Sequence, residues 1–476
     1  MDELKMINNG SGASVSGADL ETFKSNFRGR LVIPGDADYD EVRTLWNGMH
    51  DKKPGIIARC TGVADVMASV NFARDHQILL AVRGGGHNVG GSASCDGGIM
   101  IDLSLMKGVW VDPNTRTARA QGGATWGDVD RETQVFGLAT PGGVVSTTGI
   151  AGLTLGGGLG WLRRKHGLTI DNLISVDIVT ADGQFHTANS MHNADLFWAV
   201  RGGGGNFGIV TSFEYQLHPV GPMVTLCAPW YPAEEADAIL PVWNEFMKTA
   251  PEELSSTAMF WTVPAAPGFP AEAHGKRALI IAAVHSGSLE DGARIIQPLR
   301  ELGKPMLDLS GPIPWTALQS AFDGFFPKKQ QLYYFKSRNL RQLDQQTIQA
   351  IIPQACKPPA PMILIAIWNY GGAMARVGEQ ETAFTGRQVP ILFGVDAVWA
   401  DPGQTEEVLA YSRNFLSSLE PYSTGGMYVN FSGLGEEGET LVKSAYGNNY
   451  ERLVSVKNKY DPHNLFRLNQ NIKPTV

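Results

Sequence analysis

The chain reads ILLAVRGGGHNVGG over residues 78–91. Residues 78–82 are apolar, as in a short buried strand, and five of the nine residues that follow are glycine. Without a Cβ in the way, the backbone N–H groups of such a loop can approach an anion closely. A histidine held inside it, His87, has little reason to serve as core packing. The pattern predicts a phosphate-binding loop with a functional histidine, and a plain glycine-rich turn is the alternative.

Glycine is concentrated in three more places, all before residue 210. The chain holds 55 glycines among 476 residues, well above the usual share of about 7%. The segment GLTLGGGLGW (152–161) precedes RRKHG (163–167). Backbone donors followed by three cations would suit a pyrophosphate, and a solvated basic turn fits equally well. The remaining places are Gly122–Gly123 and 201–208.

The segment RGGGGNFG (201–208) contains a formal GxGxxG at Gly203, Gly205 and Gly208. A dinucleotide fingerprint must leave a strand and open a helix. Here the preceding ADLFWAVR has a helical pattern, and the following IVTSFEYQL alternates like a strand. The order is reversed, which argues against a Rossmann site.

Composition excludes several classes of protein. A net charge of −8 argues against a nucleic-acid partner, which calls for a clustered basic face. No run of 18 apolar residues predicts a membrane span, and the polar N-terminus lacks a signal core. The four cysteines and ten histidines show no metal-ligand spacing. We therefore expect a soluble, cytoplasmic protein without a metal; the sequence gives no oligomeric state.

Periodicity predicts an α+β fold. A helical stripe fits residues 63–76, and residues 173–183 end in an Asp-Gly turn typical of a hairpin. Residues 99–106 read as a strand, as do 278–287, 361–372 and 389–400, and 289–303 reads as a helix. From about residue 216 the pattern favours an antiparallel sheet with helices on one face.

The order of these motifs resembles the berberine bridge enzyme-like FAD-linked oxidases, which have the vanillyl-alcohol oxidase/p-cresol methylhydroxylase (PCMH-type) fold. Among the members of this family, the bacterial enzymes that act on hydroxynicotine resemble this sequence most in the pattern of these motifs. The resemblance covers residues from about 30 to 475 and rests on five segments: RGGGHNVGG, GGATWGDV, TTGIAGLTLGGGLGWLRRKHGLTIDN, DLFWAVRGGGGNFGIVTSFEYQL and NKYDPHNLFRLNQNI.

The resemblance implies a FAD-binding domain over 1–215, a substrate-binding domain over 216–431 and a return segment over 432–476 that completes the FAD domain. It implies FAD bonded covalently through His87 to the 8α-methyl carbon of the isoalloxazine. Many plant members add a second bond from a cysteine, but that position here is Val145, which predicts a single bond. The cofactor-binding residues implied are His87, Arg83, Gly84, Gly85, Gly86, Asn88, Gly91, Thr147, Thr148, Gly149, Gly152, Leu153, Gly157, Gly158, Gly160, Trp161, Ile209, Asn469 and Asn471.

Thr148 and Leu153 match the pair that lines the edge of the flavin where oxygen reacts. A small polar threonine leaves room for O2, which favours an oxidase over a strict dehydrogenase.

The substrate side matches less well. FTGRQVPILFGVDAVW (384–399) resembles a strand that presents a catalytic Gln or Glu in plant members, but the matching position falls on Val395 or Gly394. Asp396 is a substitute proton acceptor. The other candidate is Tyr428, with Asn430 on the same face of an expected strand, MYVNF (427–431).

The expected activity is hydride transfer from a small organic substrate to FAD, followed by reoxidation with O2 to hydrogen peroxide. Fold does not fix the substrate, although aromatic residues after position 216 slightly favour an aromatic or alkaloid-like molecule over a sugar. The rivals are a cyclase or dehydrogenase of a biosynthetic intermediate that does not use O2, and a flavin-binding protein without catalysis.

Overall fold

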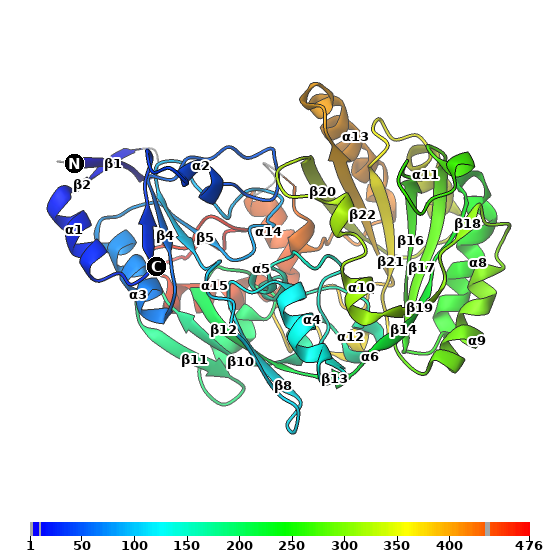
Figure 1. Cartoon of the computed structure of the whole chain (residues 1–476), viewed down its shortest axis with the longest axis horizontal. Helices are drawn as coiled ribbons and strands as arrows, with labels where there is room; N and C mark the ends of the chain where they lie inside the picture. Colours follow the sequence, from blue (N-terminus) through cyan, green and yellow to red (C-terminus); the bar gives the residue numbers. More distant parts are fainter. Residues whose placement is uncertain (1–2, 9–10, 434–437) are drawn as a thin grey trace.

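The computed structural model describes residues 3–8, 11–433 and 438–476. Three larger sheets and the helices around them give the expected α+β architecture (Figure 1). Positions 1–2 and 9–10 of the expected first segment, and 434–437 of the expected last one, lie outside the described residues.

The first sheet positions the glycine-rich loop. Its strand order is β3-β4-β6-β5, with β4, β6 and β5 parallel and β3 antiparallel to β4. Helix α3 has the expected buried stripe of Val66, Val70 and Ala73. The loop leaves the end of β5, which is the carboxyl end of the parallel strands. The elements are β3 (Arg30–Val32), β4 (Ile56–Arg59), α3 (Val63–Asp75), β5 (Leu80–Arg83) and β6 (Ile99–Asp102).

The second sheet is antiparallel throughout and has the order β11-β10-β12-β8-β7. The predicted hairpin is β10 with β11. A helix precedes the 201–208 loop and a strand follows it, as expected. The elements are β7 (Val109–Asp112), β8 (Thr117–Gln121), α4 (Trp126–Gln134), α5 (Ile150–Leu155), β10 (Leu173–Val179), β11 (Phe185–Asn189), α7 (Ala194–Val200) and β12 (Ile209–Gln216).

The third sheet contains nine strands within the described ranges, and their pairings there are all antiparallel. Its strands are β14 (Met223–Cys227), β15 (Pro229–Pro232), β16 (Leu254–Thr262), β17 (Arg277–His285), β18 (Leu307–Asp308), β19 (Gly311–Pro314), β20 (Leu332–Leu340), β21 (Leu364–Asn369) and β22 (Ile391–Trp399). Figure 1 shows it at the right, in green and yellow.

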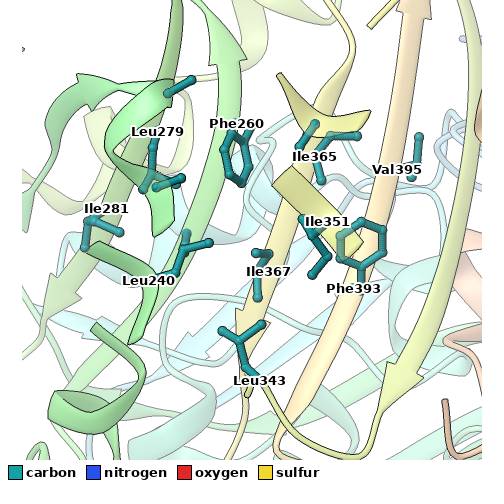
Figure 2. Close-up of a cluster of buried hydrophobic side chains, with 14 of the residues drawn as sticks. Leu240, Phe260, Leu279, Ile281, Leu343, Ile351, Ile365, Ile367, Phe393 and Val395 are labelled. Carbon is teal, nitrogen blue, oxygen red and sulfur yellow. The ribbon is translucent and has the colours of Figure 1, made fainter. Parts of the chain in front are cut away.

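One face of this third sheet is covered by helices, as predicted. Side chains of α8 (Ala236–Thr249), α9 (Leu289–Arg300), α11 (Gln345–Ala355) and α13 (Thr405–Ser418) pack on it in one hydrophobic cluster. Figure 2 shows part of this cluster, with Ile365, Ile367, Phe393 and Val395 from β21 and β22. Because side chains alternate along a strand, Leu364, Ala366, Trp368 and Leu392 belong to a different cluster on the other face.

The C-terminal segment packs back against the first 215 residues. Helix α15 (Tyr450–Tyr460) is followed by its C-cap Asp461 and by Pro462. The buried ammonium of Lys457 donates to Asp461 Oδ2 at 2.6 Å and to the carbonyl of Asn206 at 2.8 Å. This ties the tail to the 201–208 loop. No helix in the described part of the chain is both long and apolar enough to cross a membrane.

Candidate active site

A cavity of about 340 Å³ lies where the three sheets meet. Its wall is built from the glycine-rich loop after β5, the segment 143–161, the loop before β12, the tail at 466–470 and the free face of the third sheet. Ligand sites in proteins typically enclose about 300–1,000 Å³.

The structure brings most of the predicted site residues to this wall. They come from segments far apart in sequence, so only the fold gathers them. The predicted cofactor residues on the wall are Gly84, Gly85, Gly86, His87, Asn88, Thr148, Gly149, Gly152, Leu153, Trp161, Ile209 and Asn469. The predicted catalytic residues on it are Asp396, Tyr428 and Asn430.

Arg83 is not on the wall, which corrects its expected place beside the cofactor. Its side chain is buried, and its guanidinium forms a paired contact with Asp102, with Nε–Oδ1 at 2.9 Å and Nη2–Oδ2 at 2.5 Å. A buried cation needs a counter-charge, and β6 supplies it. The strand expected over 99–106 ends at Asp102, whose Oδ1 also accepts from Ser104 N.

Four predicted glycines also lie away from the wall, because their missing Cβ makes room for protein and not for a ligand. A Cβ on Gly157 would stand 2.6 Å from the Phe384 ring, and one on Gly160 would stand 1.8 Å from the carbonyl oxygen of Gly142. Gly158 packs in the same way on Thr169, and Gly91 on His50.

Asn471 and Thr147 are the other predicted residues outside the wall. The buried Oδ1 of Asn471 has no hydrogen-bond partner within the described ranges. Thr147 does not line the cavity itself, but its Oγ1 lies 3.0 Å from Nε2 of His87, which does.

The basic run after residue 162 does not serve as a phosphate site. Helix α6 (Arg163–His166) buries Arg163 and Arg164 against the third sheet. Arg163 Nε donates to the carbonyl of Asn369 at 2.9 Å, and Arg164 Nη1 donates to Asn369 Oδ1 at 2.8 Å. These bonds join the two halves of the molecule, so the two arginines form neither a pyrophosphate site nor a solvated turn.

Glycines shape the cavity wall in two ways. A Cβ on Gly85 would lie 2.4 Å from the backbone nitrogen of Gly149, so these two loops touch only because both residues are glycine. At Gly152 and Gly205 a Cβ would meet nothing within 4 Å, and both residues line the cavity. At these two positions the backbone faces the open space of the cavity without a side chain in between.

His87 is held by an aromatic stack that the sequence did not reveal. Its ring stacks on Trp46 with centroids 4.6 Å apart, and Trp46 stacks on Tyr333 at 3.6 Å. Trp46 is fixed in turn by a hydrogen bond from its Nε1 to the carbonyl of Phe326 at 2.9 Å. Burial, reinforced by the charge of Lys328, lowers the pKa of His87 to about 3. The imidazole is therefore neutral, and its Nε2 is engaged by Thr147.

Tyr428 and Asn430 meet, though not on the strand that was expected. Residues Val429–Phe431 form a 3-10 turn, which folds Asn430 back so that its Nδ2 donates to the Tyr428 hydroxyl at 2.8 Å. Gly158 N donates to the same hydroxyl at 3.1 Å. Burial nevertheless raises the pKa of Tyr428 to about 12. These surroundings oppose its predicted role as the proton acceptor.

Asp396 has the environment that Tyr428 lacks. It lies on β22, opposite Phe335 of β20 and Leu364 of β21, on the sheet face that lines the cavity. Burial raises its pKa to about 7. Val395, the position matched by counting from Arg387, points into the helix-covered core (Figure 2).

Several wall residues were missed by reasoning from the sequence. Gly204, Gly205 and Gly208 belong to the loop that was set aside with the Rossmann reading, yet they line the cavity. The high glycine content of this loop could have indicated a ligand-binding role. The reversed order of helix and strand argued only against a Rossmann-type dinucleotide site. Trp46, Met259, Phe322 and Phe326 also line it, and no local pattern marks them.

Comparison with known families finds two matches. A family described as "FAD binding domain" matches residues 54–189, and one described as "Berberine and berberine like" matches residues 427–473. The first contains the His87 loop and the 147–161 segment. The second contains Tyr428, Asn430 and the returning tail.

Comparison with single proteins gives full-length similarity. The chain is 31% identical to an FAD-linked oxidoreductase of Dictyostelium discoideum, over 96% of this chain and 97% of the relative. It is similar to the crystal structure of 6-hydroxy-D-nicotine oxidase from Arthrobacter nicotinovorans, with a TM-score of 0.83, 28% identity, and 94% and 98% of the two chains covered. A chitooligosaccharide oxidase gives a TM-score of 0.85 at 25% identity, with 96% and 99% covered.

Proposed function

We propose that this chain, which belongs to the berberine-like family of FAD-linked oxidoreductases, is an oxidase that holds FAD through His87 and passes electrons from a small organic substrate to O2. The observation that carries this proposal is the neutral, stacked His87 on the wall of a cavity shared with Thr148 and Asp396.

The wall fits FAD on three counts. Gly152 and Gly205 leave bare backbone facing open space, which suits a cradle for a pyrophosphate. The buried Oδ1 of Asn469 has no partner within the described residues and can accept from a bound cofactor. Phe466 and Leu468 add apolar surface for flat rings. FAD, when bound, supplies a two-electron acceptor that O2 can reoxidise with formation of hydrogen peroxide.

The state of His87 supports the proposed covalent bond. A nucleophilic nitrogen must carry a free lone pair, and an imidazole with a pKa of about 3 is unprotonated at neutral pH. With Nε2 engaged by Thr147 Oγ1, Nδ1 is the nitrogen available to bond. Val145 lies on the same wall and offers no thiol, so we propose one covalent bond and not two.

Asp396 is the proposed proton acceptor. Its carboxyl is on the cavity wall with a pKa near neutrality, where a general base works best. Tyr428 is instead a hydrogen-bonding group whose hydroxyl accepts from Asn430 and Gly158. A cyclase would be favoured if the cavity lacked a proton acceptor. Because Asp396 lines the cavity, this reason for proposing a cyclase is removed.

The chain is proposed to contain two domains. Residues 1–215 and 432–476 form a FAD-binding domain, and residues 216–431 form a substrate-binding domain. They are supported by the bonds of Lys457 to the 201–208 loop and by the third sheet, whose strands run from Met223 to Trp399.

The test has two parts, both without a substrate. Purified protein precipitated with acid should keep its yellow colour in the pellet, and His87→Ala should release FAD to the supernatant. His192→Ala, at an exposed histidine, is the matched control. Flavin in the supernatant of the wild-type protein would refute the bond to His87.

The second part reduces the protein with dithionite under anaerobic conditions, removes the reductant and adds O2. We expect rapid recovery of the oxidised spectrum with one hydrogen peroxide formed per flavin. Slow recovery, at the rate of an enzyme that uses another acceptor, would refute the oxidase assignment while leaving the family assignment intact.

A further inference from the structure

Asp396 is a buried carboxyl on the cavity wall. Its exposed fraction is 8%, and its Oδ1 has no hydrogen-bond partner within the residues that the structure describes. Its neighbours across β20 and β21 are Phe335 and Leu364, which carry neither donors nor charge. A buried carboxylate is costly unless a cation or hydrogen-bond donors satisfy it.

The rest of the wall does not supply that cation. Among the described residues that line the cavity there is no Lys, Arg or Glu; its ionisable side chains are His87, Asp396 and Tyr428. Arg163 lies 5.2 Å from the centroid of the Trp368 ring, but it is outside the wall and donates to backbone carbonyls. When this carboxyl is ionised, the wall thus offers it no counter-charge, and a bound cation would supply one.

The wall around Asp396 is apolar and largely aromatic. Met259, Leu364 and Trp368 come from the third sheet, and Trp161, Phe322, Phe335 and Phe431 complete this side. A sugar would leave most of its hydroxyl groups unpaired here, which costs free energy for each one. Aromatic faces instead favour apolar rings and cations.

We propose that the substrate is a protonated amine with an aromatic or apolar body, whose ammonium group pairs with the carboxylate of Asp396. This inference rests on the proposed oxidase function and names its substrate class. Of the substrates open to such an oxidase, an amine alone brings both a positive charge and N–H donors to the unpartnered carboxyl. A phenol or alcohol brings a donor without the charge, and a sugar lacks the apolar body.

The chemistry balances with Asp396 in this place. One N–H proton of the ammonium passes to the carboxylate, which frees the nitrogen lone pair. The C–H bond next to nitrogen then breaks as a hydride departs, and the lone pair forms a C=N bond. The two electrons end on O2, which takes up two protons and becomes hydrogen peroxide, and water hydrolyses the imine.

The test uses the flavin-containing protein and two isosteric pairs. N-methylbenzylamine is compared with benzyl methyl ether, and N-methyl-2-naphthylmethylamine with the corresponding ether, because each pair differs mainly in a charged NH₂⁺ against a neutral oxygen. Binding is measured anaerobically at pH 8 by calorimetry, with the flavin spectrum recorded alongside. We expect each amine to bind at least about tenfold more tightly than its ether, a ratio that corresponds to about 1.4 kcal/mol.

Asp396→Asn should abolish this ratio, because the amide keeps the shape of the side chain and removes its charge. Asp177→Asn is the matched control: Asp177 of β10 is similarly buried, with 7% of its surface exposed, but is not on the wall, so the preference should persist. Equal binding of amine and ether to the wild-type protein, or a preference that survives in Asp396→Asn, overturns the inference. The wild-type comparison stands even if a variant fails to fold.

Failure of this inference is distinguishable from failure of the proposed function. Reoxidation by O2 after dithionite reduction requires no amine. If that reoxidation is fast and the amine preference is absent, only the substrate class is wrong. If it is slow, the oxidase function fails whatever binds to Asp396.

Discussion

Among the residues that the structure describes, three ionisable side chains share the cavity wall. At the scale of single residues, their surroundings separate their pKa values widely. Burial disfavours the charged form of each. It lowers the pKa of His87 to about 3 and raises that of Tyr428 to about 12. The same cause raises the pKa of Asp396 to about 7. Near neutral pH, therefore, His87 and Tyr428 stay neutral and Asp396 alone changes its charge.

The rate of flavin reduction by a substrate should follow the ionisation of Asp396. Because the carboxylate is the active form and its pKa is raised, the rate should increase as pH rises through about 7 and level off above it. Stopped-flow bleaching under anaerobic conditions from pH 5 to 9 measures this. In Asp396→Asn the rise should disappear and the rate should fall about 10²- to 10⁴-fold. An unchanged pH profile in the variant would place the titrating group elsewhere.

Thr148 is a second residue whose role is open to a direct test. It lies on the cavity wall beside Gly149 and Leu153, where a small polar side chain leaves space for O2. Thr148→Leu fills that space and should slow reoxidation more than it slows reduction, as measured by stopped flow in the two half-reactions. Thr148→Ser, which adds no bulk, should leave both near wild type. Equal slowing of both steps by leucine would remove Thr148 from the path of oxygen.

At the scale of elements, the cavity depends on how closely two loops approach. The loop after β5 touches the turn before α5 through Gly85 and Gly149, where a Cβ on Gly85 would lie 2.4 Å from a backbone nitrogen. Helix α5 then places Gly152 on the wall. The glycines of these elements have two separate uses: some admit protein backbone, and others leave the cavity open.

Gly152→Ala separates cofactor binding from stability. Alanine favours a helix over glycine by about 1 kcal/mol, and a Cβ here meets no protein atom within 4 Å. The protein should therefore unfold at the same temperature or higher, yet its flavin content should fall because the methyl group projects into the cradle. Absorbance of the flavin per chain and thermal unfolding of the apoprotein provide the measurements.

The control for this change is Gly62→Ala, where a Cβ also meets nothing within 4 Å but the residue is not on the wall. Its flavin content should equal that of wild type. Full flavin content in Gly152→Ala would show that the cofactor does not use this part of the wall.

At the scale of the whole molecule, the part of the chain that forms the third sheet contacts the N-terminal part next to the cavity. Asp130 of α4 accepts hydrogen bonds from Trp315 Nε1 at 2.8 Å and from Gln319 Nε2 at 3.2 Å, both on α10 (Trp315–Gln319). Gln319 also donates to the carbonyl of Gly143, a wall residue. The packing of the two halves and the shape of the cavity are thus linked.

Trp315→Phe should loosen this junction in a pH-dependent way. Burial raises the pKa of Asp130 to about 6, above the value of about 3.9 in an unfolded chain. The stabilising contribution of this group is thus complete below about pH 4 and is lost as pH rises through about 6. Removing the Trp315 donor makes the buried carboxylate costlier, so we expect a loss of about 1–3 kcal/mol in the free energy of unfolding at pH 8.

A smaller loss is expected at pH 4, where Asp130 is neutral. Denaturant unfolding at the two pH values measures the difference. Trp110→Phe, at a tryptophan that is 62% exposed, should change neither value. A loss in Trp315→Phe that does not depend on pH would mean that packing, and not the bond to Asp130, is what Trp315 contributes.

Local patterns were enough to predict several elements of this protein. The helix at 63–76, the hairpin at 173–183 and three strands of the third sheet follow from hydrophobic period and turn residues, which act over a few neighbours along the chain. The strand expected over 427–431 was wrong, because Val429–Phe431 form a 3-10 turn. The glycine-rich loop with His87 could also be predicted from local sequence, because a run of glycines around a single histidine is recognisable without the fold. The order of such segments also carried the family, which the full-length similarity confirms.

What only the tertiary structure decided is which side chains meet. Asp396 and Val395 are neighbours in sequence, and the register of β22 with β20 and β21 sends one to the cavity and the other to the core. Trp46 reaches His87 across about forty residues, and Arg83 turns to Asp102 because a buried charge must be paired. The pKa of Asp396 belongs to the same class of property. It is set by the apolar groups that surround the carboxyl, and those groups come together only when the chain has folded.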